Sequence, residues 1–288
     1  MWLLSLLLLG DTTGSFQVMV APGELVRVLS VGTGAPVVFV PGLFGSAYGF
    51  RNVIPALEAA GYRSIVIEPL GIGTSGRPEH ADYSLTAQAD RIAAVLDTLR
   101  VTHAVLVAHA VGASMMYRLA YRRPDLVRGL VSLDGGPTET AATPGFRRSM
   151  RFAPWIKWFG GLNLIRRRIR HSLIAASGDS TWVDAAVLDA YTAGAAADLD
   201  GTLKAYLRMT RAREAERLEP HLVQIRCPVL LLIGTARHDG GINAAELVSL
   251  RSGLRAFTID TVLAAGLFLQ EERPDAVVAA VRRMVRQN

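Results

Sequence analysis

The sequence predicts an α/β fold, with a mostly parallel central sheet and helices on both of its faces. Short apolar runs alternate with amphipathic stretches from about residue 16 onward. Several runs are continuously apolar, as expected of strands that are covered on both faces. The alternation stops for about ninety residues after position 133 and then resumes. We interpret this interruption as a helical insert in one crossover of a single sheet.

Each strand is predicted from an apolar or β-branched run, and each helix from its apolar spacing and its ends. The clearest helix places Ile92, Val95 and Leu99 on one face. The expected strands cover residues 16–20, 24–30, 37–40, 64–67, 104–108, 127–133, 229–233 and 256–260. The expected helices of the sheet domain cover 48–60, 86–99, 112–122, 244–250 and 274–285. We therefore divide the chain into an apolar segment at 1–15, a core at 16–136 and 224–288, and a helical cap at 137–223.

Composition excludes several classes of protein. The 288 residues are 50% apolar, which excludes disorder as the main state. The single cysteine, Cys227, excludes an internal disulfide framework and a cysteine-cluster metal site. The formal net charge is +6, but the segment from Arg147 to Gly178 alone carries +8 with no acid, so +6 minus +8 leaves −2 for the rest. The basic character belongs to the insert, and because no recognition fold accompanies it we expect no nucleic-acid binding.

Four motifs lie on this framework in a fixed order. They are VPGLFGS at 40–46, EPLGIGTSGRP at 68–78, AHAVGA at 108–113 and GLFLQEERP at 266–274. The chain resembles the α/β-hydrolase superfamily, in particular its esterase-like and lipase-like members with a helical cap, across nearly all of its length after the first fifteen residues. The resemblance implies an α/β-hydrolase fold. It also implies backbone N–H donors of an oxyanion hole at Leu43 and Val111, and a pocket that includes Phe44, His109 and Phe268.

The catalytic positions depart from the family pattern. Ala110 stands at the nucleophile position of the elbow, and Leu267 stands where the family has its histidine. A methyl group cannot attack a carbonyl, and leucine can neither accept nor donate a proton. We favour Asp134 as the family's acid position, with Asp239 as a shifted alternative. Without a histidine to orient, Asp134 is interpreted as a carboxylate that caps the start of the insert.

We do not expect the other candidate side chains to replace the missing nucleophile or base. Ser114 lies one helical turn after the elbow without a strained turn of its own, and Ser46 and Ser75 are interpreted as turn residues. The adjacent pair at 238–239, His and Asp, is expected to be solvated in a loop. His and Asp are too sparse for a metal site, so we expect neither a metal nor a cofactor.

The ends and the insert suggest contact with apolar partners. Met1 to Leu9 is apolar except for one serine, and three alternatives stay open: an export signal, a segment that dips into a membrane surface, or a segment packed on the domain or a misassigned start. In the insert, an apolar stripe of Phe152, Trp155 and Phe159 precedes an Arg-rich stretch. This pattern fits a lid over the pocket, or an interfacial helix that contacts an anionic membrane.

Three hypotheses for the function follow. The first is a catalytically impaired protein that binds an apolar or lipid-like ligand, or a partner, through the pocket. The second is a hydrolase of ester-like substrates that uses unusual groups, or an inactivated copy of one. The third is a membrane-docked scaffold that uses Met1 to Leu9 and the Arg-rich cap. The cellular location stays open, with export and membrane association as alternatives.

Overall fold

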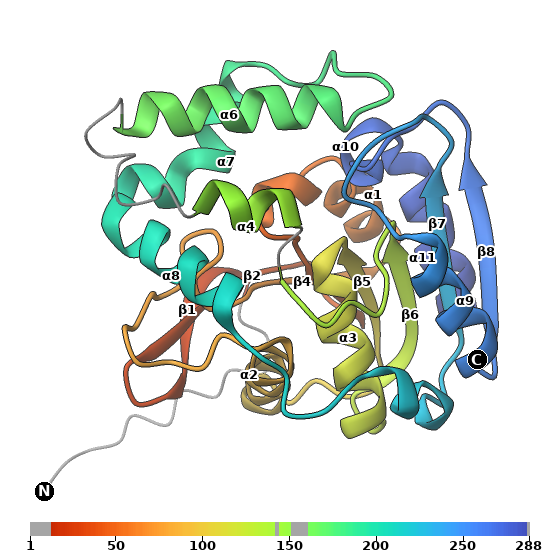
Figure 1. The fold of residues 1–288 in the computed structure, drawn as a ribbon. Helices are drawn as coiled ribbons and strands as arrows, with labels where there is room; N and C mark the ends of the chain where they lie inside the picture. Colours follow the sequence, from red (N-terminus) through yellow and green to blue (C-terminus); the bar gives the residue numbers. More distant parts are fainter. Residues whose placement is uncertain (1–12, 142–143, 151–160, 287–288) are drawn as a thin grey trace, which may run out of the picture.

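The computed structural model describes residues 13–141, 144–150 and 161–286. Within these ranges eight strands form one sheet in the order β1-β2-β4-β3-β5-β6-β7-β8 (Figure 1). β2 runs antiparallel to both of its neighbours, and all other neighbouring strands are parallel. This confirms the predicted fold class. The strands are β1 (Gly14–Ala21), β2 (Glu24–Val31), β3 (Ala35–Val40), β4 (Tyr62–Glu68), β5 (Ala104–His109), β6 (Val127–Leu133), β7 (Val229–Gly234) and β8 (Phe257–Val262).

Two apolar layers hold the sheet from opposite faces. Alternate residues of a strand point to opposite faces, so Val37 and Phe39 of β3 enter one cluster while Val38 and Val40 enter the other. The first cluster contains side chains of α1 and α11, and the second contains side chains of α2 and α3. Continuously apolar strands are therefore buried on both sides, as the sequence predicts. These helices are α1 (Ile54–Glu58), α11 (Pro274–Arg286), α2 (Leu85–Thr98) and α3 (Val111–Arg122).

The predicted helix at 48–60 is wrong as a continuous element. The chain forms a short 3-10 helix, η1 (Ala47–Phe50), and then begins α1 at Ile54. Pro55 explains the break, because its ring nitrogen cannot donate a hydrogen bond and the ring would clash with the carbonyl four residues earlier, at Arg51. Because of this break, the segment around Tyr48 is separate from α1, and it lines the cavity described below.

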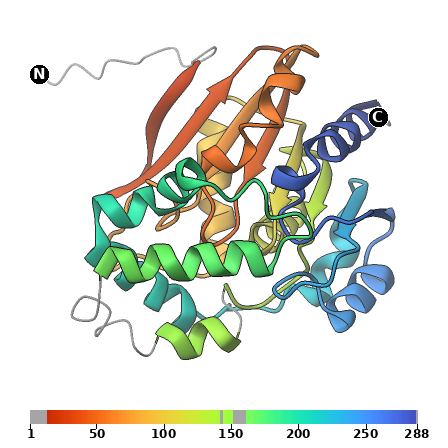
Figure 2. The same cartoon turned by 90° about the horizontal axis from the view of Figure 1, so that it is seen from above.

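Among the described residues of the insert, four α-helices lie between β6 and β7 in the chain. They are α4 (Pro144–Met150), α6 (Gly161–Ala175), α7 (Ala185–Ala197) and α8 (Leu199–Arg211). In Figure 1, α6 and α7 lie on the side towards which the arrowheads of β7 and β8 point, which is the carboxyl edge of the sheet. Figure 2 shows the same helices from above, spread over that edge. The remaining short elements are η2 (Glu219–Gln224), α9 (Ala244–Gly253) and α10 (Leu269–Glu272).

Two of the predicted apolar segments fall outside the described residues. These are Met1 to Leu9 and the stripe formed by Phe152, Trp155 and Phe159. Among the residues that the structure does describe, no helix combines the length and the apolar character needed to cross a bilayer. The division between core and cap at 137 and 223 stays a prediction.

Candidate active site

The turn between β5 and α3 has the backbone of a nucleophile elbow, but it carries a methyl group. Ala110 adopts φ 48° and ψ −121°, a region that non-glycine residues rarely occupy. Small neighbours make this turn possible. A Cβ added at Gly112 would lie 2.9 Å from the carbonyl oxygen of Val40, and one added at Gly135 would lie 2.3 Å from the carbonyl oxygen of Ala110. The elbow is therefore tightly enclosed around a side chain that has no nucleophilic atom.

The two predicted oxyanion donors lie beside the elbow. Val111 is the first residue of α3, so its N–H has no acceptor within the helix. Leu43 follows β3, and its carbonyl accepts a hydrogen bond of 2.9 Å from the hydroxyl of Tyr206 in α8. Both residues line the same cavity as Ala110. That their N–H groups act together on a ligand oxygen stays a prediction.

His109 and Leu267 line the cavity next to the elbow. His109 Nε2 lies 3.1 Å from the carbonyl oxygen of Leu267, and because a carbonyl only accepts, this nitrogen carries the proton. Burial lowers the pKa of His109 to about 4, so its ring is neutral at pH 7. The ring also contacts Phe268, with the ring centroids 5.2 Å apart. The structure thus brings the predicted pocket residues Phe44, His109 and Phe268 to one cavity.

Asp134 has a histidine partner, which corrects two expectations from the sequence. Its Oδ2 lies 2.7 Å from His238 Nε2, and its Oδ1 accepts the backbone N–H of Ile242 at 3.0 Å. The His238 side chain is only 8% exposed, so it is not solvated, and Asp134 does not serve merely as a cap of the insert. The pair forms because β6 and β7 are neighbours, which places the loop after each strand at the same edge.

Both ring nitrogens of His238 form hydrogen bonds within the protein. His238 Nδ1 lies 2.8 Å from the carbonyl oxygen of Ala236, so Nδ1 must carry a proton. Nε2 then either donates to the Asp134 carboxylate or accepts from its protonated form, and burial raises the pKa of Asp134. Both ring nitrogens are engaged, Nδ1 within its own loop and Nε2 by Asp134 in the loop after β6. The pair therefore offers no base to the elbow in this conformation.

The remaining candidate residues are occupied or are distant from the chemistry. Ser114 Oγ donates to the carbonyl of Thr138 at 2.6 Å, and Ser75 Oγ donates to the carbonyl of Glu68 at 2.6 Å. Ser46 lines the cavity, and its buried Oγ has no hydrogen-bond partner among the described residues. Asp239 lines the cavity as well, but it is exposed. Within the described ranges, no group of three or more metal-ligating side chains could hold an ion.

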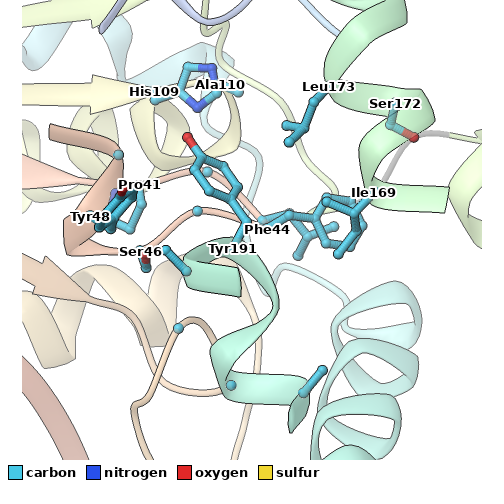
Figure 3. Close-up of a pocket in the computed structure, with 18 of the residues that line it drawn as sticks. Pro41, Phe44, Ser46, Tyr48, His109, Ala110, Ile169, Ser172, Leu173 and Tyr191 are labelled. Carbon is cyan, nitrogen blue, oxygen red and sulfur yellow. The ribbon is translucent and has the colours of Figure 1, made fainter. Parts of the chain in front are cut away.

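The cavity runs from the elbow to the insert and has a volume of about 1680 Å³. Figure 3 shows Ala110 and His109 facing Leu173 and Ile169 of α6, with Tyr191 of α7 between the two sides. Most of the wall is apolar. Its further apolar residues come from both the sheet domain and the insert: Leu43, Phe44, Phe146, Met150, Ile165, Ala195, Leu203, Leu267 and Phe268.

The sequence did not indicate a buried cluster that joins the insert to the core. Glu271 accepts hydrogen bonds from Arg51 Nη1 at 2.8 and 2.7 Å and from the Tyr191 hydroxyl at 2.9 Å. Burial raises the pKa of Glu271, and the guanidinium opposes this shift. Its neighbour Glu272 accepts the backbone N–H groups of Gly178 at 2.8 Å and of Asp179 at 2.9 Å. In the sequence, only the two adjacent acids of the motif at 266–274, Glu271 and Glu272, pointed to this cluster.

Known proteins share both the sequence motifs and the fold. The alpha/beta hydrolase fold family matches residues 35–164. A putative carbamate hydrolase, RutD, of Klebsiella pneumoniae (strain 342) is 31% identical over 160 residues, which cover 56% of this chain and 53% of RutD. Bifunctional epoxide hydrolase 2 of Sus scrofa is 30% identical over 118 residues, or 41% of this chain and 21% of that protein. The chain therefore spans about half the length, or less, of these curated relatives.

A solved structure resembles almost the whole chain. The epoxide hydrolase CorEH without ligand superposes with a TM-score of 0.79 at 20% identity, covering 95% of this chain and 98% of that one. At that identity the likeness shows the fold alone. Together with the family match at 35–164 and the strand order, it places the chain among proteins built on the same sheet. The chain has the α/β-hydrolase fold, and its residues 35–164 match the alpha/beta hydrolase fold family.

Proposed function

We propose that this protein binds an apolar ligand in the cavity beside Ala110 and does not catalyse hydrolysis. The observation that carries the proposal is the chemistry of the two family positions that face this cavity. Ala110 presents a methyl group and Leu267 an isobutyl group, in place of a nucleophile and a base. Neither can form an acyl intermediate or transfer a proton.

The two histidines next to the elbow, His109 and His238, do not substitute for the missing base. The proton on Nε2 of His109 is held by the carbonyl of Leu267, and the low pKa keeps its ring neutral. His238 is tied to Asp134 and Ala236. A general base must reach the proton it removes within about 2.6–3.2 Å. These fixed contacts therefore favour binding over catalysis.

The cavity itself supports an apolar ligand. A volume of about 1680 Å³ exceeds the roughly 300–1,000 Å³ that is common for small-molecule sites. Burying the apolar surface of a ligand against such a wall contributes about 25 cal/mol per Å² before the cost of association. The mostly apolar wall also carries polar groups, among them the Ser46 hydroxyl, which has no hydrogen-bond partner among the described residues.

A hydrolase of ester-like substrates is the second candidate. The strained elbow, the enclosing glycines and the placement of Leu43 and Val111 support it, because together they present backbone donors to a substrate oxygen. Two relatives are named as a putative carbamate hydrolase and an epoxide hydrolase. The oxyanion hole and substrate binding together leave about 10³–10⁴-fold acceleration over water in a well-studied protease stripped of its triad.

Hydrolysis of short and long acyl p-nitrophenyl esters separates the two candidates. We expect no turnover by the wild type above that small background, and a gain for Ala110→Ser/Leu267→His. Adding His238→Ala should raise the rate further, because it frees the Asp134 carboxylate for the new histidine. Clear wild-type turnover that disappears when Ala195→Trp fills the cavity would overturn the non-catalytic proposal.

Binding is tested with a neutral apolar fluorophore, N-phenyl-1-naphthylamine. We expect its fluorescence to rise on addition of the wild type and to rise much less with Ala195→Trp, whose side chain would project into the cavity. Ala245→Trp, at an exposed position of α9, is the matched control and should behave as the wild type. Equal signals from all three proteins would place the probe elsewhere.

A further inference from the structure

One helix carries both an apolar wall and an unpaired positive charge. α6 contributes Ile165, Ile169 and Leu173 to the cavity. The same helix carries Arg166, Arg167, Arg168 and Arg170 within five successive positions. α6 therefore places apolar and basic side chains next to each other. A ligand that contacts both needs an apolar part and a negatively charged part.

The four arginines differ in their partners. Arg166 forms an ion pair with Asp189 of α7. Arg167, Arg168 and Arg170 are exposed, and within the described ranges none of them pairs with an acid. Three adjacent guanidinium groups without counter-charges create a positive potential that attracts anions. Arg166 serves as the control residue. It carries the same charge on the same helix, but it is already paired with Asp189.

Arg167 and Arg168 belong to the wall of the cavity, together with His171. The apolar residues Ile169 and Leu173 of the same helix face Ala110 and His109 (Figure 3). From Arg167 to Leu173 the helix rises about 9 Å, at about 1.5 Å per residue. Ile165 precedes the two arginines and Ile169 follows them, so basic and apolar side chains lie side by side along this part of the wall.

The elbow end of the cavity is less favourable for a negative group than the α6 side. His109 is neutral there, and its Nε2 proton is already donated to Leu267. The side chain of Asp239 lines the cavity near that end, where a Cβ on the adjacent Gly240 would lie 3.6 Å from Leu267 Cδ2. An anionic head placed at the elbow would meet the backbone N–H groups of the predicted oxyanion hole, but it would lose its hydration beside a neutral ring and an acid. The guanidinium groups of α6 therefore favour the orientation in which the head group lies at that helix.

We infer that the ligand is a single-chain amphiphile with an anionic head group. Its hydrocarbon chain lies in the apolar cavity towards Ala110, and its head group contacts Arg167 and Arg168 at the α6 side. Guanidinium groups bind carboxylates and phosphates through paired N–H donors. The inference rests on the proposed apolar-ligand function and adds the class and the orientation of the ligand.

The test compares dodecanoate with dodecan-1-ol as competitors of N-phenyl-1-naphthylamine at pH 8, below the concentrations at which they aggregate. Because a carboxylate is better hydrated than a hydroxyl, the readout is the change in the ratio of the two affinities between proteins. We expect Arg167→Gln/Arg168→Gln to weaken dodecanoate about tenfold and to leave dodecan-1-ol within about twofold. The control, Arg166→Gln, should leave the ratio unchanged. Added salt should shrink the effect.

Each other outcome has a distinct meaning. If neither competitor displaces the probe, the apolar-binding function itself is wrong. If both compete and the ratio is the same in all three proteins, apolar binding stands and the anionic head group is refuted. Flotation with phosphatidylglycerol-containing vesicles covers the remaining case. If the double variant loses flotation while its dodecanoate affinity is unchanged, the arginines serve a membrane surface and the inference is overturned.

Discussion

Removing the positive charge from the buried Glu271 cluster should destabilise the protein in a way that depends on pH. The Glu271 side chain is fully buried, and Arg51 Nη1 lies 2.7 Å from its Oε2. Arg51→Met keeps much of the stem but removes the charge. The Tyr191 hydroxyl, which burial keeps protonated by raising its pKa, still donates to Oε1 at 2.9 Å. The carboxylate would then be buried beside neutral donors only, the Tyr191 hydroxyl and, at 3.5 Å, the Asn52 amide.

The size of the effect is limited by protonation. A carboxyl group with an ordinary pKa of 4.5 can always escape its penalty by binding a proton, at about 1.4 kcal/mol per pH unit above that value. The penalty from charge is thus at most about 1.4 kcal/mol at pH 5.5 and about 3.4 kcal/mol at pH 7. Loss of the contact between Arg51 and the Tyr48 ring, 4.2 Å from its centroid, adds about 0.5–1 kcal/mol at either pH.

The sign follows from linkage. Burial already raises the folded-state pKa of Glu271, and loss of the guanidinium raises it further. A group with a raised folded pKa favours the fold fully below its unfolded pKa, and this contribution is lost as the pH rises through the folded pKa. The variant should therefore fall further behind the wild type between pH 4.5 and 7.

Urea unfolding at pH 5.5 and pH 7 measures this directly. We expect Arg51→Met to lose more stability at pH 7 than at pH 5.5, by up to about 2 kcal/mol. The control is Arg51→Met/Glu271→Gln, which has no carboxyl group to titrate and should show nearly the same deficit at both values. An equal loss at both pH values for the single variant would refute the reasoning. It would mean that the charge of Glu271 does not depend on Arg51 for its compensation.

Three further predictions follow from other buried groups. Gly135→Ala places a Cβ within 2.3 Å of a backbone oxygen of the elbow, so it should cost about 3 kcal/mol or prevent folding, as thermal unfolding would show. His238→Ala leaves Asp134 without its 2.7 Å partner and should cost about 1–3 kcal/mol, while the exposed Asp239→Ala should change stability by less than about 0.5 kcal/mol. Burial raises the pKa of the Cys227 thiol to about 11, so a disulfide reagent at pH 8 should label it slowly until denaturant is added.

The architecture could be predicted because its signals are local. Strand β3 is apolar at every position and β5 at every position before His109, and glycines or prolines close the helices that follow. The helix expected at 48–60 failed for a local reason too, since the apolar pattern continues across Pro55 while the hydrogen bonding does not. The turn at Ala110 could likewise be placed from the sequence, whereas the assignment of Leu267 to the family's histidine position stays a prediction.

The Asp134–His238 pair could not be predicted in the same way. His238 lies in a short polar stretch that resembles any exposed loop, and its partner is 104 residues away. Only the adjacency of β6 and β7 brings the two loops together, and Gly241 lets the chain close over the pair, because a Cβ there would lie 2.4 Å from Asp134 Oδ1. Long-range polar contacts of this kind depend on topology rather than on local pattern. The same holds for Glu271 and Arg51, which are 220 residues apart.

The strained elbow is therefore weak support for catalysis in this protein. Its positive φ at Ala110 costs about 1–3 kcal/mol, and in an enzyme that strain would serve to expose a nucleophile. Here the surrounding backbone is sufficient to hold it: Gly112 approaches the end of β3, and Gly135 approaches the carbonyl of the turn. A turn enclosed in this way persists whichever small side chain it carries. Activity must be judged from the side chains that face the cavity, and at Ala110 and Leu267 these are hydrocarbon.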